Sequence, residues 1–539
     1  MPAATRLAVS LTTARPPLNQ QVRAAVRAGA ELIELRADLI DDDHQVASLL
    51  NSPRRPPVIL TVRSPREGGR GRGSAAQRLA RLERLARCGP EWVDIEYATW
   101  RRHAPRCTRS GMVRASKSSG TAGPALSRSL VDGLIARPTA RARPPALILS
   151  HHDLKRTPRS LDAILDRLAA ARPAVAKLAV TAADAIDALR VLELLRRRAS
   201  ARPTIALAMG EAGLASRVLA RKFGAFLTFA ALDRRHVAAP AQPTIAELRG
   251  LYRWDAINRR TAVYGVVGWP VAHSRSPHVH NAAMAADAIN GVYLPLPVRP
   301  TRAAFTRFMD LVAGAQWLDV RGLSVTIPHK VHALRWLRRR GYAVSERAAR
   351  CGAVNTLIRR AGGAWAGDNT DVAGAQAALW TLPGLTRGGL RGRRVDVLGA
   401  GGVARAVVAA LRECGCRVTI YSRAPAAGRT LARRFGCEWR PWAQRAAANG
   451  EVLINCTSVG MWPAVNRSPL PARALGRARI VFDTVYTPPR TRLLRDARRR
   501  GCRAISGLEM FIGQAAEQYR LWHARRAPLG VMRRVRAGN

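Results

Sequence analysis

The chain has 539 residues, 47% of them hydrophobic, so it is too long for one ordinary domain and has enough apolar residues for two to four packed cores. No uncharged apolar run reaches the roughly eighteen residues needed to cross a membrane, so we expect no membrane association. The formal net charge of +53 comes with only 5% aromatic residues and no basic arm or zinc-finger spacing, so we expect no specific nucleic-acid partner.

The first 257 residues alternate short apolar runs with amphipathic stretches. Such alternation predicts eight parallel strands joined by helices, and the fold class that fits is α/β with a closed (β/α)8 barrel. The predicted helices include 75–88, 161–171 and 183–198. The predicted strands are 7–12, 32–36, 58–62, 92–97, 146–150, 175–180, 204–208 and 226–230.

Residues 98–145 are rich in Arg, Ser and Pro and weakly patterned, which predicts an insertion between the fourth and fifth strands. A helix over 245–257 is expected to close this half, and 258–261 to be a linker. A second α/β pattern begins at Ala262. We expect a frayed basic tail after a helix over 508–525.

Lysine is rare: 84 of the 89 basic residues are arginine and five are lysine. A retained lysine can lose its proton and act as an amine, which arginine cannot. Lys177 lies in an apolar strand, where burial favours the neutral amine that forms a Schiff base with a ketone. Lys330 ends the segment Gly-Leu-Ser-Val-Thr-Ile-Pro-His-Lys. Lys117, Lys155 and Lys222 have polar neighbours and are interpreted as surface charge.

Polar residues gather where the barrel strands end, which is where such barrels carry their chemistry. His152 follows the fifth strand and is the natural base for the proton made acidic by an imine. Asp153 or Glu67 could orient its ring. Three arginines near strand or loop ends could clamp a carboxylate by paired hydrogen bonds: Arg36, Arg63 and Arg217.

These residues stand in motifs that resemble type I 3-dehydroquinate dehydratase over about residues 5–255. The matching segments are Glu34–Asp38, Thr61–Gly69, Ser150–Asp153 with Thr157-Pro158, Lys177, and Met209 to Arg217. The resemblance implies an imine at Lys177, with His152 as acid and base and Glu67 as its orienting partner. It also implies a substrate-binding set of Ser10, Glu34, Arg36, Arg63, Arg217 and Gln242.

The closing loop departs from that family's usual Ser-Ala-Pro-Gly-Gln, because it reads Ala238-Ala-Pro-Ala-Gln242. The missing serine removes one expected substrate hydrogen bond, worth about 0.5–1.5 kcal/mol. Alanine in place of glycine makes a positive φ at position 241 less comfortable. We expect weaker binding rather than lost activity.

A dinucleotide-type turn follows the predicted strand 394–398. Glycines there allow a tight bend and a close approach of the pyrophosphate to a helix N-terminus. The next strand ends in Ser422-Arg423, and an arginine at that place favours the 2′-phosphate of NADP over the free hydroxyl of NAD. Upstream, Lys330 and Asp371 could form an ion pair that protonates an alkoxide without a metal.

The second half resembles shikimate dehydrogenase over about residues 262–525. The matching segments are Gly268–Pro277, Leu323–Lys330, Gly352–Thr356, Gly367–Asp371, Asn455–Ser458, Asp483 to Tyr486 and Gly507 to Gln514. The resemblance implies catalysis by Lys330 and Asp371 and a substrate-binding set of Ser274, Ser276, Thr326, Asn355, Tyr486 and Gln514. The cofactor contacts expected with NADP (NADPH) are Gly399, Ala400, Gly401, Gly402, Val403, Ser422, Arg423, Thr457 and Gly507.

The family's second cofactor arginine, four residues after the first, is replaced here by Ala427, which leaves the strength of the NADP preference open. The predicted domains are a barrel over 1–257, a substrate lobe over 262–385 completed by the helix 507–525, and an NADP-binding Rossmann-like domain over 386–506.

The sequence therefore predicts a bifunctional shikimate-pathway enzyme that dehydrates 3-dehydroquinate and reduces the resulting 3-dehydroshikimate to shikimate. Two alternatives stay open: a reductase for quinate or a related polyol with a weak or inactive barrel half, and a basic nucleic-acid-binding protein. The paired hydroxyls of Ser276 and Thr370 favour shikimate. The eight cysteines show no disulfide or metal spacing, so we expect reduced thiols, no metal and a cytoplasmic location. The oligomeric state is not predicted.

Overall fold

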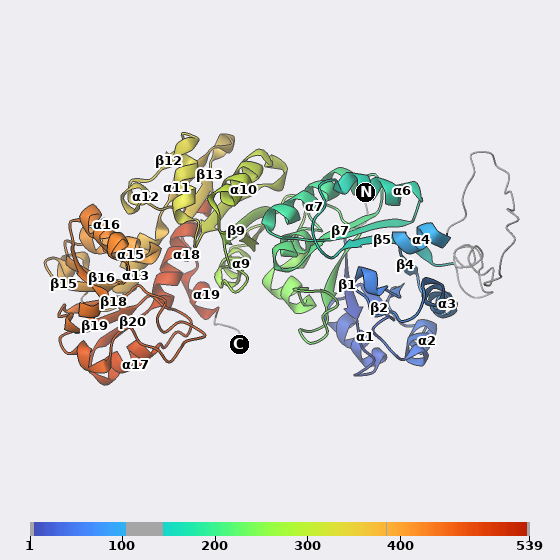
Figure 1. Ribbon diagram of the computed structural model, residues 1–539, viewed down its shortest axis with the longest axis horizontal. Coiled ribbons are helices and arrows are strands. Elements are labelled where there is room, and N and C mark those ends of the chain that lie inside the picture. The colour runs from blue at the N-terminus through green and yellow to red at the C-terminus, as the bar shows by residue number, and fades with distance from the viewer. Residues whose placement is uncertain (1–4, 104–143, 384, 536–539) are drawn as a thin grey trace, which may run out of the picture. The chain divides into compact units, whose positions relative to one another are not determined.

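The computed structural model describes residues 5–103, 144–383 and 385–535. The chain divides into two compact units, Met1–Thr261 and Ala262–Asn539 (Figure 1). Each unit has its own sheets and its own buried cores. Each is described by itself below.

Eight parallel strands form the sheet of the first unit, in the order β7-β6-β5-β4-β3-β2-β1-β8. The end strands β7 and β8 are joined by a hydrogen bond from the Phe226 amide to the Thr204 carbonyl (2.8 Å) rather than by a ladder, so the barrel is nearly closed. The predicted strands are confirmed to within a few residues: β1 Arg6–Leu11, β2 Leu32–Arg36, β3 Val58–Thr61, β4 Trp92–Glu96, β5 Ala146–Asp153, β6 Val175–Thr181, β7 Thr204–Met209 and β8 Leu227–Ala231.

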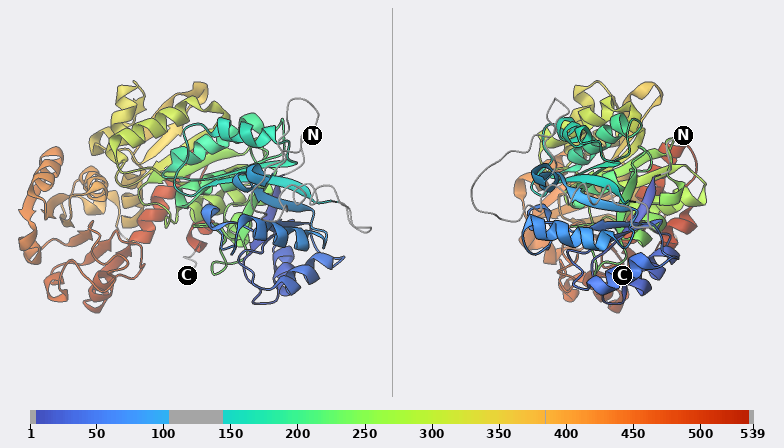
Figure 2. Two further views of the ribbon diagram at one scale, coloured as in Figure 1. Left: turned by 45° about the vertical axis from the view of Figure 1, so that its right-hand side comes forward. Right: turned by 90° about the vertical axis from the view of Figure 1, so that its right-hand side faces the viewer.

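Helices follow most strands, and side-chain caps mark where several of them begin. Ser74 and Gln77 form a reciprocal capping box at the start of α3, and the Asp184 side chain caps α7. The helices of this unit are α1 Leu18–Arg27, α2 Asp43–Asn51, α3 Ala75–Ala86, α4 Tyr97–His103, α6 Leu161–Ala170, α7 Ala185–Arg198 and α8 Leu214–Val218. Figure 2 shows these helices around the blue-to-green strands.

Three expectations for this unit need correction. The helix predicted over 245–257 begins at Ile245, but it becomes π-helical over Glu247–Leu251 and ends there; a separate 3-10 turn, Trp254–Ala256, follows Arg253 at φ 56°. The segment 98–145 begins as helix α4, and its central residues 104–143 lie outside the described part of the chain. Lys222 is only 4% exposed and donates to the carbonyls of Arg259 (3.1 Å) and Thr261 (2.7 Å), so it is not surface charge.

The second unit contains two six-stranded sheets. The first is mixed, in the order β10-β9-β11-β13-β14-β12, because β13 runs antiparallel to β11 and β14. Its strands are β9 Ala262–Gly268, β10 Gly291–Pro297, β11 Val320–Val325, β12 Ala343–Val344, β13 Thr356–Arg359 and β14 Trp365–Asp368. Its helices are α9 Ser276–Ala286, α10 Arg302–Gly314, α11 Lys330–Arg339, α12 Glu346–Cys351 and α13 Thr370–Leu379.

The second sheet is fully parallel, in the order β17-β16-β15-β18-β19-β20, as in a Rossmann-like domain. Its strands are β15 Arg394–Leu398, β16 Arg417–Ser422, β17 Glu438–Pro441, β18 Val452–Asn455, β19 Ile480–Asp483 and β20 Arg503–Ser506. Its helices are α14 Arg387–Leu390, α15 Gly402–Glu413, α16 Pro425–Phe435 and α17 Arg492–Arg499.

Helix α18, Gly507–His523, packs along α13 and contacts strands of both sheets (red in Figure 1). The close approach needs glycine, because a Cβ on Gly374 would lie 2.6 Å from the Met510 carbonyl oxygen. The expected frayed tail is wrong for its described part: α19, Leu529–Arg534, packs on α9 and α18 and buries Met532 completely. None of the described helices is long and apolar enough to span a membrane.

Candidate active sites

The carboxyl ends of the barrel strands surround a cavity of about 420 Å³. The cavity brings together side chains from strands and loops that are far apart in the sequence. All nine residues predicted for the barrel site line it: Ser10, Glu34, Arg36, Arg63, Glu67, His152, Lys177, Arg217 and Gln242.

Lys177 enters this cavity from β6 and is 4% exposed. Its Nζ lies 2.7 Å from Asp94 Oδ2 and 3.5 Å from Glu34 Oε1, and 4.4 Å from the centre of the Phe229 ring. Two carboxylates and an aromatic face therefore compensate the burial of the ammonium group. Asp94 stood in the sequence at the end of a predicted strand, but the prediction did not include it in the site.

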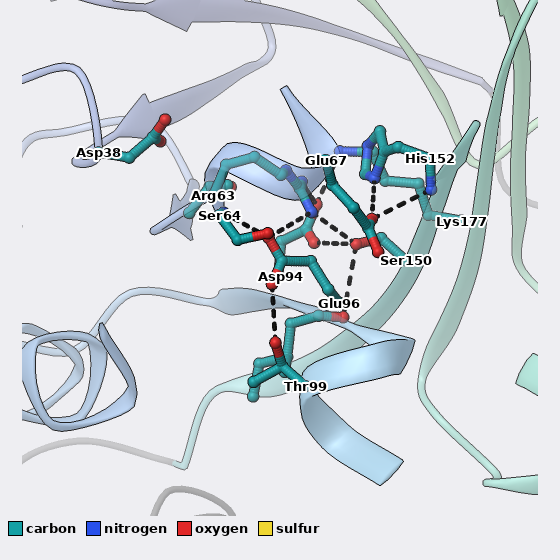
Figure 3. A network of polar contacts seen from close by, with 12 residues as sticks. Asp38, Arg63, Ser64, Glu67, Asp94, Glu96, Thr99, Ser150, His152 and Lys177 are labelled. Carbon is teal, nitrogen blue, oxygen red and sulfur yellow. Dashed lines mark hydrogen bonds and ion pairs between the residues drawn. The ribbon is translucent and has the colours of Figure 1, made fainter. Parts of the chain in front are cut away.

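Asp94 on β4 is the centre of a buried network with Ser150 on β5, Lys177 on β6 and Arg63, which follows β3 (Figure 3). Its Oδ2 accepts from Arg63 Nη2 (2.8 Å) and its Oδ1 from the Ser150 hydroxyl (2.6 Å), while Arg63 Nη1 donates to Ser150 (2.8 Å). Burial alone would raise the Asp94 pKa, but the Arg63 and Lys177 cations hold it far below its usual range. Asp94 is therefore a fixed negative charge beneath the amine.

His152 and Glu67 form the second pair in the cavity, with His152 Nδ1 2.8 Å from Glu67 Oε2. The His152 backbone N–H donates to the same oxygen (3.1 Å). Burial and the nearby cations lower the His152 pKa well below 6.5, whereas burial raises the Glu67 pKa to about 8. A neutral imidazole held at Nδ1 is ready to accept a proton at Nε2.

The glycines after Glu67 are explained by the tight turn that places this carboxylate. A Cβ on Gly69 would lie 2.1 Å from the Arg63 carbonyl oxygen, and Gly68 has φ +83°. Asp153 does not orient the imidazole. Its carboxylate accepts from the backbone N–H groups of Lys155 and Arg156 instead.

The three predicted arginines have different partners. Arg36 forms a bidentate pair with Asp38 (2.9 and 2.8 Å), and Arg63 is bound to Asp94. Arg217 donates to the Phe229 carbonyl (3.4 Å) and forms no ion pair within the described residues. Burial lowers the Arg217 pKa to about 10. Its unpaired buried guanidinium is the best placed of the three to take a substrate carboxylate.

The closing loop has a backbone conformation that is unfavourable for the alanine at position 241. Ala241 has φ 53°, which glycine adopts without strain and alanine does not. The Ala238 backbone N–H donates to Gln242 Oε1 (2.9 Å), which fixes the loop across the cavity that both residues line.

In the second unit, Lys330 at the start of α11 and Asp371 in the first turn of α13 lie side by side. Lys330 Nζ is 2.5 Å from Asp371 Oδ2, and Asn355 Nδ2 donates to Asp371 Oδ1 (2.9 Å). A Cβ built on Gly402, the first residue of α15, would lie 3.8 Å from Lys330 Cδ. The predicted proton donors are therefore next to the predicted dinucleotide turn.

The other predicted substrate residues lie on or beside α9, β11, β19 and α18. Ser274 and Ser276 lie at the start of α9, where the Ser276 amide donates to the Ser274 hydroxyl (3.3 Å). Thr326 follows β11 and is partly exposed. Tyr486 stacks on Phe511 with ring centres 4.9 Å apart.

Gln514 lies on α18, and its amide donates to the Phe511 carbonyl (2.9 Å). The Thr370 hydroxyl is buried and lies 3.1 Å from Asn355 Oδ1 and 3.0 Å from Thr356 Oγ1, and its part in favouring shikimate stays a prediction.

The turn after β15 fits a dinucleotide. Gly399 has φ +110°, and a Cβ there would lie 3.0 Å from the Cys456 carbonyl oxygen. A Cβ on Gly401 would meet nothing within 4 Å, so there is open space at the N-terminus of the twelve-residue helix α15. Free N–H groups at a helix N-terminus and space beside them are what a pyrophosphate requires.

The remaining predicted cofactor residues differ in accessibility. Arg423 is exposed, whereas the buried Ser422 hydroxyl donates to the Ala424 carbonyl (3.0 Å) and accepts from Trp439 Nε1 (3.0 Å). Ala400 and Val403 pack against the core of the parallel-sheet lobe. Thr457 donates to Asn455 Oδ1 (2.7 Å), and Gly507 stands where a Cβ would lie 2.4 Å from the Thr484 carbonyl oxygen.

Comparisons with known proteins agree with this geometry. The type I 3-dehydroquinase family model matches residues 7–112 and 135–259. The shikimate dehydrogenase substrate binding domain matches 266–357, and the shikimate 5′-dehydrogenase C-terminal domain matches 507–535. The chloroplastic bifunctional 3-dehydroquinate dehydratase/shikimate dehydrogenase of Arabidopsis thaliana is 33% identical over 519 residues, 93% of this chain and 79% of that protein. The chain belongs to this bifunctional family.

Relatives of the second unit alone are also found. The shikimate dehydrogenase (NADP(+)) of Pelobacter propionicus is 41% identical over 51% of this chain and 95% of its own length. The crystal structure of shikimate 5-dehydrogenase from Thermus thermophilus with NADP(H) and shikimate is 34% identical, with a TM-score of 0.45, and covers 51% of this chain and 98% of that one. The resemblance and the fold class predicted from the motifs are confirmed.

Within the bifunctional fold, sequence reasoning missed polar residues that contact the predicted sites only through the tertiary structure. Asp94 and Ser150 carried a usable signal, since both stand at the carboxyl ends of barrel strands. Tyr293, Ser324 and Gln518 lie behind the Lys330–Asp371 pair. Tyr293 and Ser324 have apolar neighbours in the sequence, which favour a core interpretation, and Gln518 carries no local signal of this contact.

Proposed function

We propose that this chain performs both reactions of its family: the barrel dehydrates 3-dehydroquinate through an imine at Lys177, and the second unit reduces 3-dehydroshikimate to shikimate. The observation that supports the first step is the single cavity that holds Lys177 and His152 together with the unpaired Arg217. The second step rests on the 2.5 Å Lys330–Asp371 contact beside Gly402.

In the barrel, Arg217 would hold the substrate carboxylate and thereby present the ketone to Lys177 Nζ. The amine attacks the carbonyl carbon, and loss of the carbonyl oxygen as water leaves a protonated imine. His152, neutral through burial, then removes the proton from the adjacent carbon, because the imine accepts the electron pair.

The same His152 returns that proton to the departing hydroxyl, which leaves as water and forms the ring double bond. Glu67 keeps the imidazole oriented throughout, and Asp94 supports the positive charge of the imine nitrogen. Hydrolysis of the imine releases 3-dehydroshikimate and restores the amine.

In the second unit, Ser274 and Ser276 would hold the substrate carboxylate. Lys330 would donate a proton to the alkoxide oxygen formed from the ketone, and Asp371 would hold the ammonium in place for that transfer. The NADPH that the Gly399–Gly402 turn and Arg423 would bind supplies the hydride for this reduction.

A coupled assay tests both steps at once. Full-length protein is given 3-dehydroquinate and NADPH, and nucleotide oxidation is followed. Oxidation should require both substrates and should stop in Lys177→Arg unless 3-dehydroshikimate is added directly. Oxidation that continues in Lys177→Arg with 3-dehydroquinate alone would contradict the imine mechanism.

We also propose that the protein works in a reducing compartment. Seven cysteines within the described residues are all free thiols, four of them buried. The Arabidopsis relative is named as chloroplastic, and a cytoplasmic location for this chain stays a proposal. Thiol titration of the freshly isolated protein with and without denaturant checks it.

A further inference from the structure

Behind the Lys330–Asp371 pair, the mixed-sheet lobe holds a continuous row of polar side chains, none more than 7% exposed. The members come from β10, β11, β13, α13 and α18 and from the loop before β13. We call this set the polar row: Tyr293, Ser324, Gln518, Thr356, Asn355 and Asp371.

The direction of the hydrogen bonds at Asn355 is fixed by groups that can act in only one way. The Thr370 backbone N–H can only donate, and it lies 2.7 Å from Asn355 Oδ1. The Asp371 carboxylate lies 2.9 Å from Asn355 Nδ2 and accepts from it. Asn355 Oδ1 therefore only accepts, and the Thr356 hydroxyl (2.8 Å) donates to it, either directly or through the Thr370 hydroxyl, which lies 3.0 Å from Thr356 Oγ1 and 3.1 Å from Asn355 Oδ1.

The same reasoning fixes the Gln518 amide. The main-chain carbonyl of Asn355 can only accept, and Gln518 Nε2 faces it (3.5 Å), so this same nitrogen donates to Thr356 Oγ1 (3.2 Å). Gln518 Oε1 then faces Ser324, whose hydroxyl donates to it (2.8 Å). Tyr293 in turn donates its phenol proton to Ser324 (2.6 Å).

Every donor in the row therefore points towards Asp371. Hydrogen bonds arranged head to tail polarise one another, and each hydroxyl or amide is held in the one orientation that satisfies both neighbours. We propose that Tyr293, Ser324, Gln518 and Thr356 are positioning residues of the reductase. They hold the Asn355 amide so that Asp371 presents its Oδ2 to Lys330.

This inference rests on the proposed proton donation by Lys330 and Asp371. It predicts that breaking the row lowers kcat rather than raising KM, because each of the four residues has its hydrogen-bond partners within the row and acts on Asp371 only through Asn355. Thr356→Val replaces the hydroxyl by a methyl group of the same shape, and Thr356→Ser keeps the hydroxyl. Thr301→Val is the matched control, since it removes a threonine hydroxyl from the same lobe at the cap of α10.

The experiment measures kcat and KM for 3-dehydroshikimate at saturating NADPH in full-length protein. We expect Thr356→Val to lower kcat about tenfold, equivalent to about 1.4 kcal/mol in the barrier. We expect its KM within about threefold of the parent, and kcat of Thr356→Ser and Thr301→Val within about twofold, well under the 1.4 kcal/mol of a tenfold change.

Two milder variants keep the proposal falsifiable if Thr356→Val does not fold. Gln518→Met breaks the row in its middle, and Tyr293→Phe removes only the terminal donor, so both should lower kcat while KM holds. The proposal is overturned if kcat is unchanged in both variants, or if KM rises in them while kcat stays the same. A parent protein that does not oxidise NADPH with 3-dehydroshikimate refutes the proposed function instead, so the two failures are distinguishable.

Discussion

The ammonium of Lys177 lies 2.7 Å from the carboxylate of Asp94, two strands away in the barrel. The strand between them contributes Ser150, which lies beside Lys177 in the register and donates to Asp94. Neighbouring parallel strands thus place an amine and a hydroxyl within hydrogen-bond distance of one carboxylate. This contact gives Lys177 a fixed counter-charge that also binds Arg63.

Replacing Lys177 by arginine should abolish the dehydratase and leave the reductase intact. A guanidinium keeps the positive charge but does not lose its proton to become a nucleophile. Separate assays with 3-dehydroquinate and with 3-dehydroshikimate plus NADPH check the two halves. Borohydride added with 3-dehydroquinate should attach the reduced adduct to Lys177 in the parent protein, and an unmodified Lys177 in a peptide map would exclude the imine.

Removing the charge of Asp94 should harm both stability and dehydration. Asp94→Asn leaves the buried Arg63 and Lys177 cations without their shared partner, and loss of one member of a buried pair costs about 3–5 kcal/mol. Urea unfolding measures the stability change. The matched control is Asp162→Asn, which breaks half-exposed pairs with Arg197 and Arg198 and should cost less than about 1 kcal/mol.

The buried His280 should make the second unit less stable to unfolding at acidic pH. Burial, with a smaller contribution from His523, lowers the His280 pKa from 6.5 to about 3. The unfolded chain binds a proton near pH 6.5 and the folded protein does not, so stability is complete above pH 6.5 and falls as the pH drops towards 3. Between pH 7 and pH 5 the loss is about 2 kcal/mol, since each pH step below 6.5 favours the protonated unfolded chain by about 1.36 kcal/mol.

His280→Phe tests this assignment, because phenylalanine can keep the stacking on Tyr293, whose ring centre lies 4.5 Å away, and cannot titrate. Urea unfolding curves at pH 7 and pH 5 should show a smaller acid-induced loss in the variant than in the parent. Equal losses in the two proteins would assign the acid sensitivity to other groups.

The strands and both reactive centres could be predicted because local sequence carries their signals. Apolar runs of five to seven residues with polar ends mark buried parallel strands, and Lys177, His152 and Lys330 stand in motifs of short range. The nine barrel residues share one cavity for the same reason: the carboxyl ends of parallel strands meet at one face.

The predictions that failed concerned residues whose surroundings are set by tertiary contacts. Lys222 has polar neighbours in sequence, yet it is buried by carbonyls 37 and 39 residues away. Gln518 reaches Ser324 across 194 residues, a separation at which no local pattern signals contact. The helix predicted over 245–257 ends at Leu251, and Arg253 takes up a positive φ before the next turn.

Cofactor preference should depend on Arg423, which is exposed directly after β16. Arg423→Asp places a carboxylate where the 2′-phosphate of NADP is expected and offers an acceptor to the free hydroxyl of NAD. The ratio of kcat/KM for NADPH to that for NADH should fall at least about tenfold, or about 1.4 kcal/mol. Arg429→Asp on α16 is the control, because that guanidinium lies over the Trp439 ring. An unchanged ratio in Arg423→Asp would contradict the assignment.

The barrel should bind 3-dehydroquinate more tightly when the hydroxyl missing from its closing loop is restored. Ala238 lines the cavity, so Ala238→Ser places a hydroxyl beside the substrate, worth about 0.5–1.5 kcal/mol, or a two- to tenfold lower KM for 3-dehydroquinate. Ala241→Gly separates binding from strain: it relieves the positive φ of Ala241 and should raise the free energy of unfolding by about 1 kcal/mol without adding a contact. Steady-state dehydratase kinetics and urea unfolding of both variants give the two effects. A KM that falls in Ala241→Gly but not in Ala238→Ser would show that loop strain, and not the lost hydroxyl, limits binding.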